Sequence, residues 1–282
     1  ATISLMGSSP GGTYTLESSG LSTTPLNGTK CWNTTTSSPG CTYVISNNVC
    51  EAGFECLETS ATYNNLISTP TLRNPLYTKV AGAGFKFDVV ALQADGTKSS
   101  TYTAASNVTA ELFDDTTSPQ PACSAYTSPI ASQAITFATT NLGRKTVASN
   151  FSISNAYRKL RCRVRDNNLT PAVYGCSSDD FSVRPSNITA TSSNANANNT
   201  GTSTTATPTI KAGANFNLTA ATGVVGYDGT PSIDSSKLAA HSGAVQVGIL
   251  SGSFSAATSS TGSATGAAFN YGEVGYFRLA AN

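Results

Sequence analysis

Short runs in which apolar and polar residues alternate recur along this chain, and they predict β-strands. Residues 85–89 place Phe85, Phe87 and Val89 on one face of an extended segment, because successive side chains of a strand point to opposite faces. Residues 160–165 alternate in the same way. No run of about 18 apolar residues occurs, so the pattern predicts no membrane-spanning helix.

One stretch of this pattern occurs twice. Residues 81–97 read AGAGFKFDVVALQADGT, and residues 212–230 read AGANFNLTAATGVVGYDGT. Both begin with A-G-A-x-F, continue with alternating residues and end in a D-G-T sequence that predicts a turn. Later in each copy, Phe151 and Phe269 precede a further strand-like segment. We interpret the two copies as a structural repeat.

The repeat predicts an all-β protein with tandem immunoglobulin-like β-sandwich domains, because a module of about 90–100 residues has the size of such a sandwich. We place the first sandwich at residues 76–182 and the second at 183–282. Residues 1–75 predict a cysteine-rich β segment that disulfides staple, and residues 194–207 predict a surface loop or linker. The chain starts without a signal-peptide pattern and ends in a strand-like segment, which is typical of a mature or truncated chain.

Composition supports the same fold class. Only 11% of the residues are charged, against roughly 25% in an average protein, so Ser, Thr and Asn must supply the polar surface. Helix formers are few, whereas Thr, Val, Tyr and Phe favour strands. The net charge of +1 predicts neither a nucleic-acid partner nor an anionic membrane partner.

Cysteine usage indicates an oxidising compartment. The seven cysteines are Cys31, Cys41, Cys50, Cys56, Cys123, Cys162 and Cys176. No CxxC pair occurs, as a zinc site would often have, so disulfides in an exported protein are the favoured interpretation. The preferred pairs are Cys31–Cys41, Cys50–Cys56 and Cys123–Cys176, although the sequence leaves the connectivity open. Cys162 is then expected to be a buried free thiol.

The side chains that catalysis needs are scarce. His241 is the only histidine, lies in a predicted loop and has no cysteine or GxSxG sequence nearby, so no nucleophile–histidine site is predicted. The adjacent pairs Asp114–Asp115 and Asp179–Asp180 would point to opposite faces of a strand and could act jointly only on a turn. Calcium binding by one of these pairs is an alternative. We expect no enzyme activity, no cofactor and no metal.

A basic strand is a candidate for polyanion binding. Arg161, Arg163 and Arg165 share one face of the alternating segment, opposite its apolar residues. A solvated outer face is the expected arrangement, and a polyanion-binding patch is the alternative.

Aromatic residues near the cysteines are candidates for ligand stacking. Trp32 follows Cys31, and it could stack on a sugar, as could Tyr43 and Tyr63. Packing of these rings against disulfides is the preferred interpretation.

Three segments resemble a known family. They are LYTKVAGAGFKFDVVAL from Leu76, YGCSSDDFSVRPSNIT from Tyr174 and FNYGEVGYFRL from Phe269. They are similar to the large uncharacterised domain of MshQ-like proteins, which are associated with biogenesis of the mannose-sensitive haemagglutinin (MSHA) type IV pilus in Gram-negative bacteria. The resemblance covers nearly all of residues 76–282 and implies an exported protein linked to surface pili. It supplies no catalytic residues.

These observations predict a non-catalytic structural or adhesive module at the bacterial cell surface, associated with pili or filaments. Self-association and pilus or surface proteins are the expected partnerships, and assembly of a filament by strand exchange or edge pairing is a sharper version. The alternative is a carbohydrate-binding, lectin-like module that recognises host or matrix glycans.

Overall fold

The chain folds almost entirely into β-strands, which confirms the all-β prediction. In this computed structural model, three 3₁₀ helices of three residues each are the only helices among the described residues. The structure describes the strands at 13–15, 33–36 and 41–44 and the residues 51–169, 171–192, 211–240, 246–274 and 277–279.

The chain divides into two compact units. The first unit consists of residues 1–77, 85–151 and 159–181. The second unit consists of residues 78–84, 152–158 and 182–282.

Three short strands near the start of the chain form one antiparallel sheet. These are β1 (Thr13–Thr15), β2 (Asn33–Thr36) and β3 (Cys41–Val44), in the order β1-β3-β2. They belong to the part of the chain in which the sequence predicts a cysteine-rich β segment.

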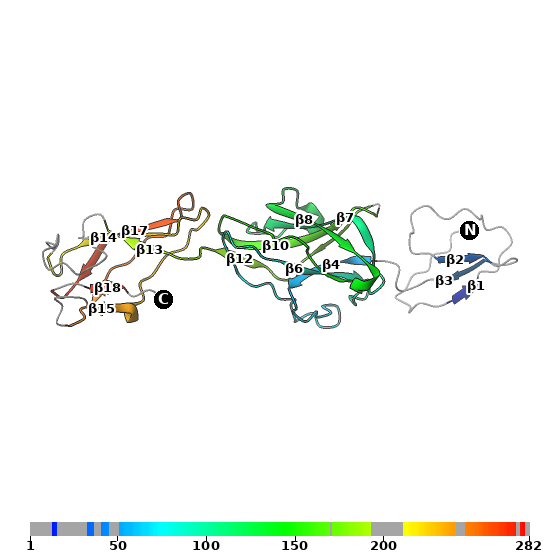
Figure 1. Ribbon diagram of the computed structural model, residues 1–282, viewed down its shortest axis with the longest axis horizontal. Coiled ribbons are helices and arrows are strands. Elements are labelled where there is room, and N and C mark those ends of the chain that lie inside the picture. Colours follow the sequence, from blue (N-terminus) through cyan, green and yellow to red (C-terminus); the bar gives the residue numbers. More distant parts are fainter. Residues whose placement is uncertain are drawn as a thin grey trace. The chain divides into compact units, whose positions relative to one another are not determined.

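Two larger sheets follow (Figure 1). The smaller has the order β4-β6-β9 and consists of β4 (Glu51–Glu58), β6 (Phe87–Gln93) and β9 (Arg144–Thr146). The larger has the order β5-β12-β10-β7-β8, with β11 also paired to β10. Its strands are β5 (Lys79–Val80), β7 (Ala104–Asp114), β8 (Ala131–Phe137), β10 (Tyr157–Asp166), β11 (Val173–Cys176) and β12 (Phe181–Arg184).

This strand order agrees with one immunoglobulin-like sandwich. All pairs within the smaller sheet are antiparallel, and in the larger sheet β12 runs parallel to β5 but β10 runs antiparallel to β7. The order β12-β10-β7-β8 matches the G-F-C-C′ strands of a variable-type sheet, and β4-β6-β9 matches A-B-E. A tandem pair of such sandwiches stays a prediction.

Alternating residues of β7 and β10 form the inner face of the larger sheet, which contributes to the core. Val108, Ala110 and Leu112 lie opposite Asp166, Val164 and Cys162, and all six are buried. Phe87 and Val89 of β6 are also fully buried, as the sequence pattern predicted. The opposite side of β7 and β10 is called the outer face below.

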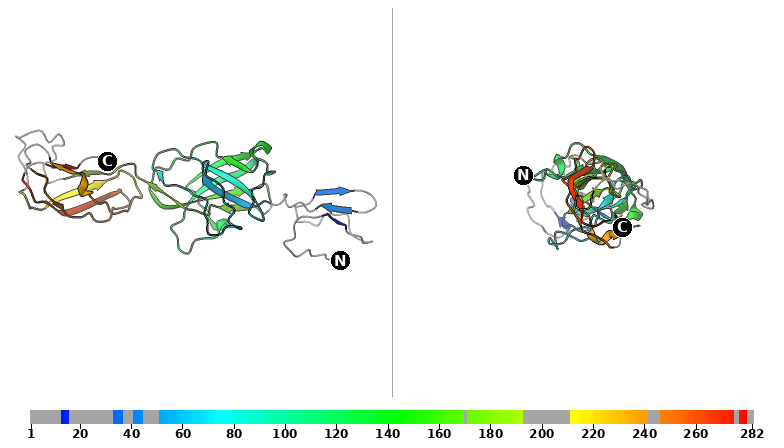
Figure 2. Two further views of the ribbon diagram at one scale, coloured as in Figure 1. Left: turned by 90° about the horizontal axis from the view of Figure 1, so that it is seen from below. Right: turned by 90° about the vertical axis from the view of Figure 1, so that its left-hand side faces the viewer.

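The second unit contains two further sheets (Figures 1 and 2). The four-stranded sheet has the order β13-β14-β17-β16, with β13 (Thr189–Thr191), β14 (Phe216–Ala221), β16 (Leu250–Ser251) and β17 (Ser263–Tyr271). The other sheet pairs β15 (Leu238–Ala240) with β18 (Phe277–Leu279). The buried core residues are Phe216, Ala220, Phe254, Ala257, Ala264, Phe269 and Tyr271.

Candidate functional site

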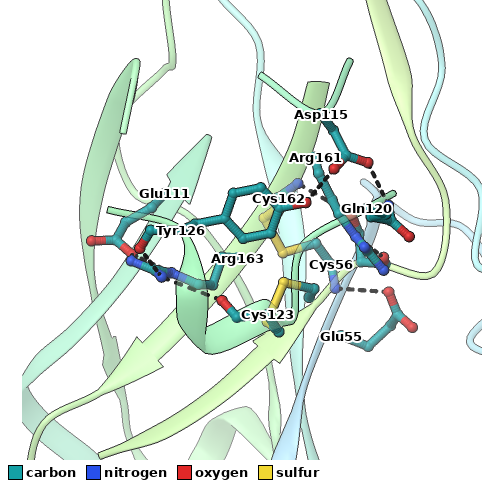
Figure 3. The surroundings of a disulfide bond; sticks show 12 residues. Glu55, Cys56, Glu111, Asp115, Gln120, Cys123, Tyr126, Arg161, Cys162 and Arg163 are labelled. Atoms are coloured by element: carbon teal, nitrogen blue, oxygen red, sulfur yellow. Dashed lines mark hydrogen bonds and ion pairs between the residues drawn. A yellow bond between two sulfur atoms is a disulfide. The ribbon is translucent and has the colours of Figure 1, made fainter. Parts of the chain in front are cut away.

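A disulfide joins the two sheets of the first unit. Cys56 of β4 bonds to Cys162 of β10, with 6.2 Å between the Cα atoms, and both residues are fully buried (Figure 3). Two expectations are therefore wrong: Cys56 does not pair with Cys50, and Cys162 is not a free thiol. The two half-cystines lie on facing strands of different sheets, so their proximity depends on tertiary packing rather than on sequence spacing.

The second disulfide lies on the outer face. Cys123, in the 3₁₀ helix Cys123–Ala125, bonds to Cys176 of β11 with 5.7 Å between the Cα atoms, which is the pairing that the sequence analysis preferred. Cys176 is directly opposite Arg163, and directly opposite residues of an antiparallel pair share a face. This bond therefore holds residues 123–126 over the outer face of β10.

The remaining candidate residues from the sequence lie outside the described part of the structure. They are Cys31, Trp32, Cys50 and His241, together with the side chains of Cys41 and Tyr43, of which only the strand backbone is described. The proposed Cys31–Cys41 bond and sugar stacking on Trp32 remain predictions.

Arg163 is buried, which contradicts the expected solvated face of β10. Its guanidinium forms an ion pair with Glu111, with Nη2 2.7 Å and Nε 2.9 Å from Oε2. It also donates to the carbonyl oxygen of Tyr126 at 2.6 Å and lies over the rings of Phe113 and Tyr174. Arg163 is buried because residues 123–126 cover this part of the outer face. The covered part forms a second, polar interior.

Asp115 lies at the end of β7 in the same polar interior. Its buried carboxylate accepts hydrogen bonds from the Tyr126 hydroxyl and the Gln120 amide, and the ammonium of Lys159 lies 3.2 Å away. Burial opposes ionisation, but these donors outweigh it and lower the pKa of Asp115. Asp114 is exposed and accepts a hydrogen bond from the Thr116 N–H instead. The two carboxylates of Asp114 and Asp115 therefore do not act jointly.

The other carboxylate pair is also divided between two partners. Asp180 lies 3.2 Å from the Lys159 ammonium, and burial raises its pKa. Asp179 accepts a hydrogen bond from the Leu76 backbone N–H at 3.1 Å and another from Arg73 at 3.4 Å. Across the described part of the chain, no group of three His, Cys, Asp or Glu side chains is arranged to hold a metal ion.

The C-S-S-D sequence that starts at Cys176 fastens a loop to the first unit. The Ser178 hydroxyl accepts from the Asn74 N–H at 3.1 Å, and the Ser178 N–H donates to Glu55 Oε1 at 2.8 Å. Ser177 accepts from the Cys162 N–H at 3.2 Å. This string, on which the family resemblance depends in part, therefore has a structural role in the fold.

Glu55 is a buried acid that the sequence analysis missed. Its carboxylate accepts hydrogen bonds from the N–H groups of Ser178 and Cys56 and, at 3.2 Å, from the Asn74 amide. Burial outweighs these donors and raises the pKa of Glu55 to about 7. The available signal was an acidic residue inside the apolar run Gly53–Leu57, where a charge is unusual unless it has partners.

Two cavities are open to ligands. The first, of about 240 Å³, is in the first unit, and its lining includes Tyr63, Ile67, Gln93 and Tyr174. Ile67 is 65% exposed at this cavity. The second cavity, of about 320 Å³, is in the second unit, and its lining residues are Thr230, Pro231, Ser232, Ile233, Ser235, Leu250, Gly252, Ser253, Phe254 and Phe269. Glu55 also lines the first cavity.

Among the residues that the structure places, no helix has the length and apolar character needed to cross a membrane. Comparisons with protein-family models, with curated proteins and with solved structures found no match for this chain.

Proposed function

We propose that this chain is a non-catalytic structural or adhesive module of the bacterial cell surface, exported through the periplasm and associated with pili or filaments. The observation that carries the proposal is the Cys56–Cys162 bond, which ties the two sheets of the first unit together. Such bonds persist in oxidising compartments outside the cytoplasm and stabilise domains that work there. The resemblance to MshQ-like proteins supports the further step to the surface of a Gram-negative cell near pili.

The polar groups of the first unit support a structural role over a catalytic one. Arg163 and Glu111 form a buried ion pair, and Asp115 accepts a hydrogen bond from the Tyr126 hydroxyl in the same buried network. Glu55 holds the loop around Asn74 in place. Side chains that are committed to such contacts stabilise a fold, whereas a catalytic acid or base needs access to a substrate.

Assembly by edge pairing is the sharper version of this proposal. In the first unit, β8 lies close to β9 and β4 lies close to β11. In the second unit, β13 and β16 are the outer strands of the four-stranded sheet, and outer strands can accept a strand from another molecule. Association of copies through β13 or β16 would use the second unit.

Carbohydrate binding is the second candidate function. Tyr63, which the sequence analysis named as a stacking residue, lines the 240 Å³ cavity together with Tyr174. Aromatic rings beside polar groups are suited to sugars, because one face of a sugar is apolar and its rim carries hydroxyls.

Localisation and oligomeric state test the main proposal. Immunogold electron microscopy and fractionation of expressing cells should place the protein on the surface, in complexes larger than a monomer. Ala190→Lys in β13 or Ser251→Lys in β16 should reduce assembly, because a charge on an edge disfavours strand addition. Ser132→Lys on the exposed side of β8 is the matched control. A monomer confined to the periplasm would contradict the proposal.

A further inference from the structure

A row of side chains crosses the outer face of the larger sheet beyond the part that residues 123–126 cover. Arg165 of β10 lies directly opposite Thr109 of β7 and, on its other side, directly opposite Tyr174 of β11. Thr109 in turn lies opposite Ala134 of β8. Directly opposite residues share a face, so these four side chains form one line.

Arg165 differs in its partners from Arg161 and Arg163, the two other arginines on this face of β10. Arg163 is neutralised by Glu111, and Arg161 donates to the carbonyl oxygen of Ser177 at 3.0 Å. Arg165 approaches Glu111 only to 3.9 Å, and its side chain is 36% exposed. Its ion pair with Glu111 is therefore longer and weaker than that of Arg163.

Two polar atoms in the row lack hydrogen-bond partners. They are Nε of Arg165 and the hydroxyl oxygen of Thr109, and both are shielded from solvent in the conformation described. A buried donor without a partner is unfavourable, so this arrangement favours any ligand that supplies an acceptor. The exposed end of Arg165 leaves the side chain free to turn toward such a ligand.

We propose that Arg165, Thr109 and Tyr174 form a binding site for the carboxylate of an acidic sugar. A carboxylate accepts two parallel hydrogen bonds from the Nε and Nη2 edge of an arginine. The Thr109 hydroxyl can bond to a neighbouring sugar hydroxyl, and the half-buried ring of Tyr174 offers an apolar surface to the sugar ring.

The charges beside the site favour a carboxylate over a phosphate. Glu111 lies close to Arg165 and would repel a doubly charged phosphate more strongly than a singly charged carboxylate. The site gives the adhesive part of the proposed function a ligand class and rests on that function. It also places the recognition of the sugar on a paired sheet rather than on a loop.

Titrations of the isotope-labelled protein with single sugars test the site. Glucuronate and N-acetylneuraminate should shift the NMR signals of the Arg165 side chain and the Thr109 amide, whereas glucose and acetate should bind at least about tenfold more weakly. Arg165→Gln should abolish binding, and Thr109→Val should weaken it. Arg73→Gln removes the same charge from an exposed side chain of the first unit and should leave binding unchanged.

Several outcomes would overturn the site. They are equal binding of glucose, equal binding of acetate, tighter binding of an acidic peptide, or unchanged binding by Arg165→Gln. If that variant fails to fold, Arg165→Lys serves in its place, because lysine keeps the charge but lacks the two-pronged donor edge. Acidic-sugar binding by a protein that proves to be periplasmic and monomeric would refute the proposed function alone, while surface location without sugar binding would refute the site alone.

Discussion

Phe85 and Phe151 face each other across an antiparallel bridge, with ring centroids 5.8 Å apart. Phe216 and Phe269 form the equivalent pair in the second unit, with ring centroids 6.3 Å apart. These are the phenylalanines that the sequence repeat aligns. The repeat therefore corresponds to a shared arrangement of strands, in which the A-G-A-x-F segment pairs with a distant strand.

The glycine of this segment makes the same contact in both copies. Gly82 donates its N–H to the Ile153 carbonyl, and Gly213 donates to the Tyr271 carbonyl, both at 2.8 Å. Gly213 has φ +76°, and no atom lies within 4 Å of the place that a Cβ would take. Gly213→Ala should thus cost about 1–2 kcal/mol, from the backbone alone.

Urea denaturation of the Gly213→Ala protein measures this cost. Gly213→Asn is the control and should cost less, because asparagine tolerates a positive φ better than alanine does. An alanine variant as stable as the original protein would show that the glycine is not needed for the turn.

Removal of the Cys56–Cys162 bond should destabilise the first unit strongly. The half-cystines are 106 positions apart, and a loop of about 100 residues gains about 4.7 kcal/mol when it is closed in the chain-entropy model. We expect Cys56→Ser with Cys162→Ser to lower the free energy of unfolding by about 4–5 kcal/mol, as measured by denaturation in urea.

Loss of the Cys123–Cys176 bond is the comparison for this variant. Its separation is 53, half as large, so the double serine variant should cost about 0.6 kcal/mol less. Peptide mapping without reductant should recover both bonds in the original protein. A Cys50–Cys56 peptide in that map would contradict the connectivity.

Stability should fall as the pH rises, because of Glu55. Its pKa is 4.5 in the unfolded chain and about 7 in the folded protein, so the folded state holds the proton more tightly. The contribution is complete below pH about 4.5 and is lost as the pH rises to about 7, a change of roughly 3 kcal/mol.

Urea denaturation at pH values across this window measures the effect. Glu55→Gln removes the titrating group, so its stability should change less over the same range. If the two proteins had the same pH dependence, Glu55 would not be its source.

Breaking the buried ion pair of Arg163 and Glu111 should lower the free energy of unfolding strongly, whereas replacing both residues by apolar ones should lower it little. Arg163→Met alone removes the closest partner of the buried Glu111 carboxylate, leaves only Arg165 at 3.9 Å, and should cost about 3 kcal/mol. Arg163→Met with Glu111→Leu removes both charges and should recover most of that loss. A double-mutant cycle based on thermal unfolding measures the coupling, and additive effects of the two changes would contradict it.

Local patterns predicted much of this fold. Alternation identified the strands around Phe87 and Leu160, because every second residue of each strand is an apolar core residue. In β6 the residues between them, Asp88 and Val90, are buried as well, which alternation did not predict. The repeat aligned Phe151 with Phe269, and each of them pairs with the phenylalanine of its A-G-A-x-F segment. The Cys123–Cys176 bond was a preferred pair, because it would close a long loop across a β domain, and the structure contains it.

The sequence patterns could not predict the contacts between sheets. Cys56 and Cys162 lie in different sheets, and nothing in their spacing indicates that β4 faces β10. The preference for Cys50–Cys56 assumed that a short separation decides a bond, although geometry in the folded state decides it. The burial of Arg163 escaped prediction for a related reason: alternation assigns a residue to a face but does not show that another segment covers that face.

The second D-G-T sequence shows the same limit. Asp95 accepts from Thr97 within its own turn, whereas Asp228 accepts two hydrogen bonds from the Arg158 guanidinium at 2.7 and 2.8 Å. The same D-G-T sequence therefore has different roles in the two copies, because Arg158, from elsewhere in the second unit, binds the Asp228 carboxylate.

The bond between Cys56 and Cys162 also sets how far the first unit can be stretched. A chain segment of 106 residues reaches about 350–380 Å when it is fully extended. Tension applied along the chain would pass through the sulfur atoms and leave this segment slack, even if every hydrogen bond of the unit were broken. Under such tension the segment between Cys56 and Cys162 would thus add almost nothing to the length of the protein until the bond was reduced.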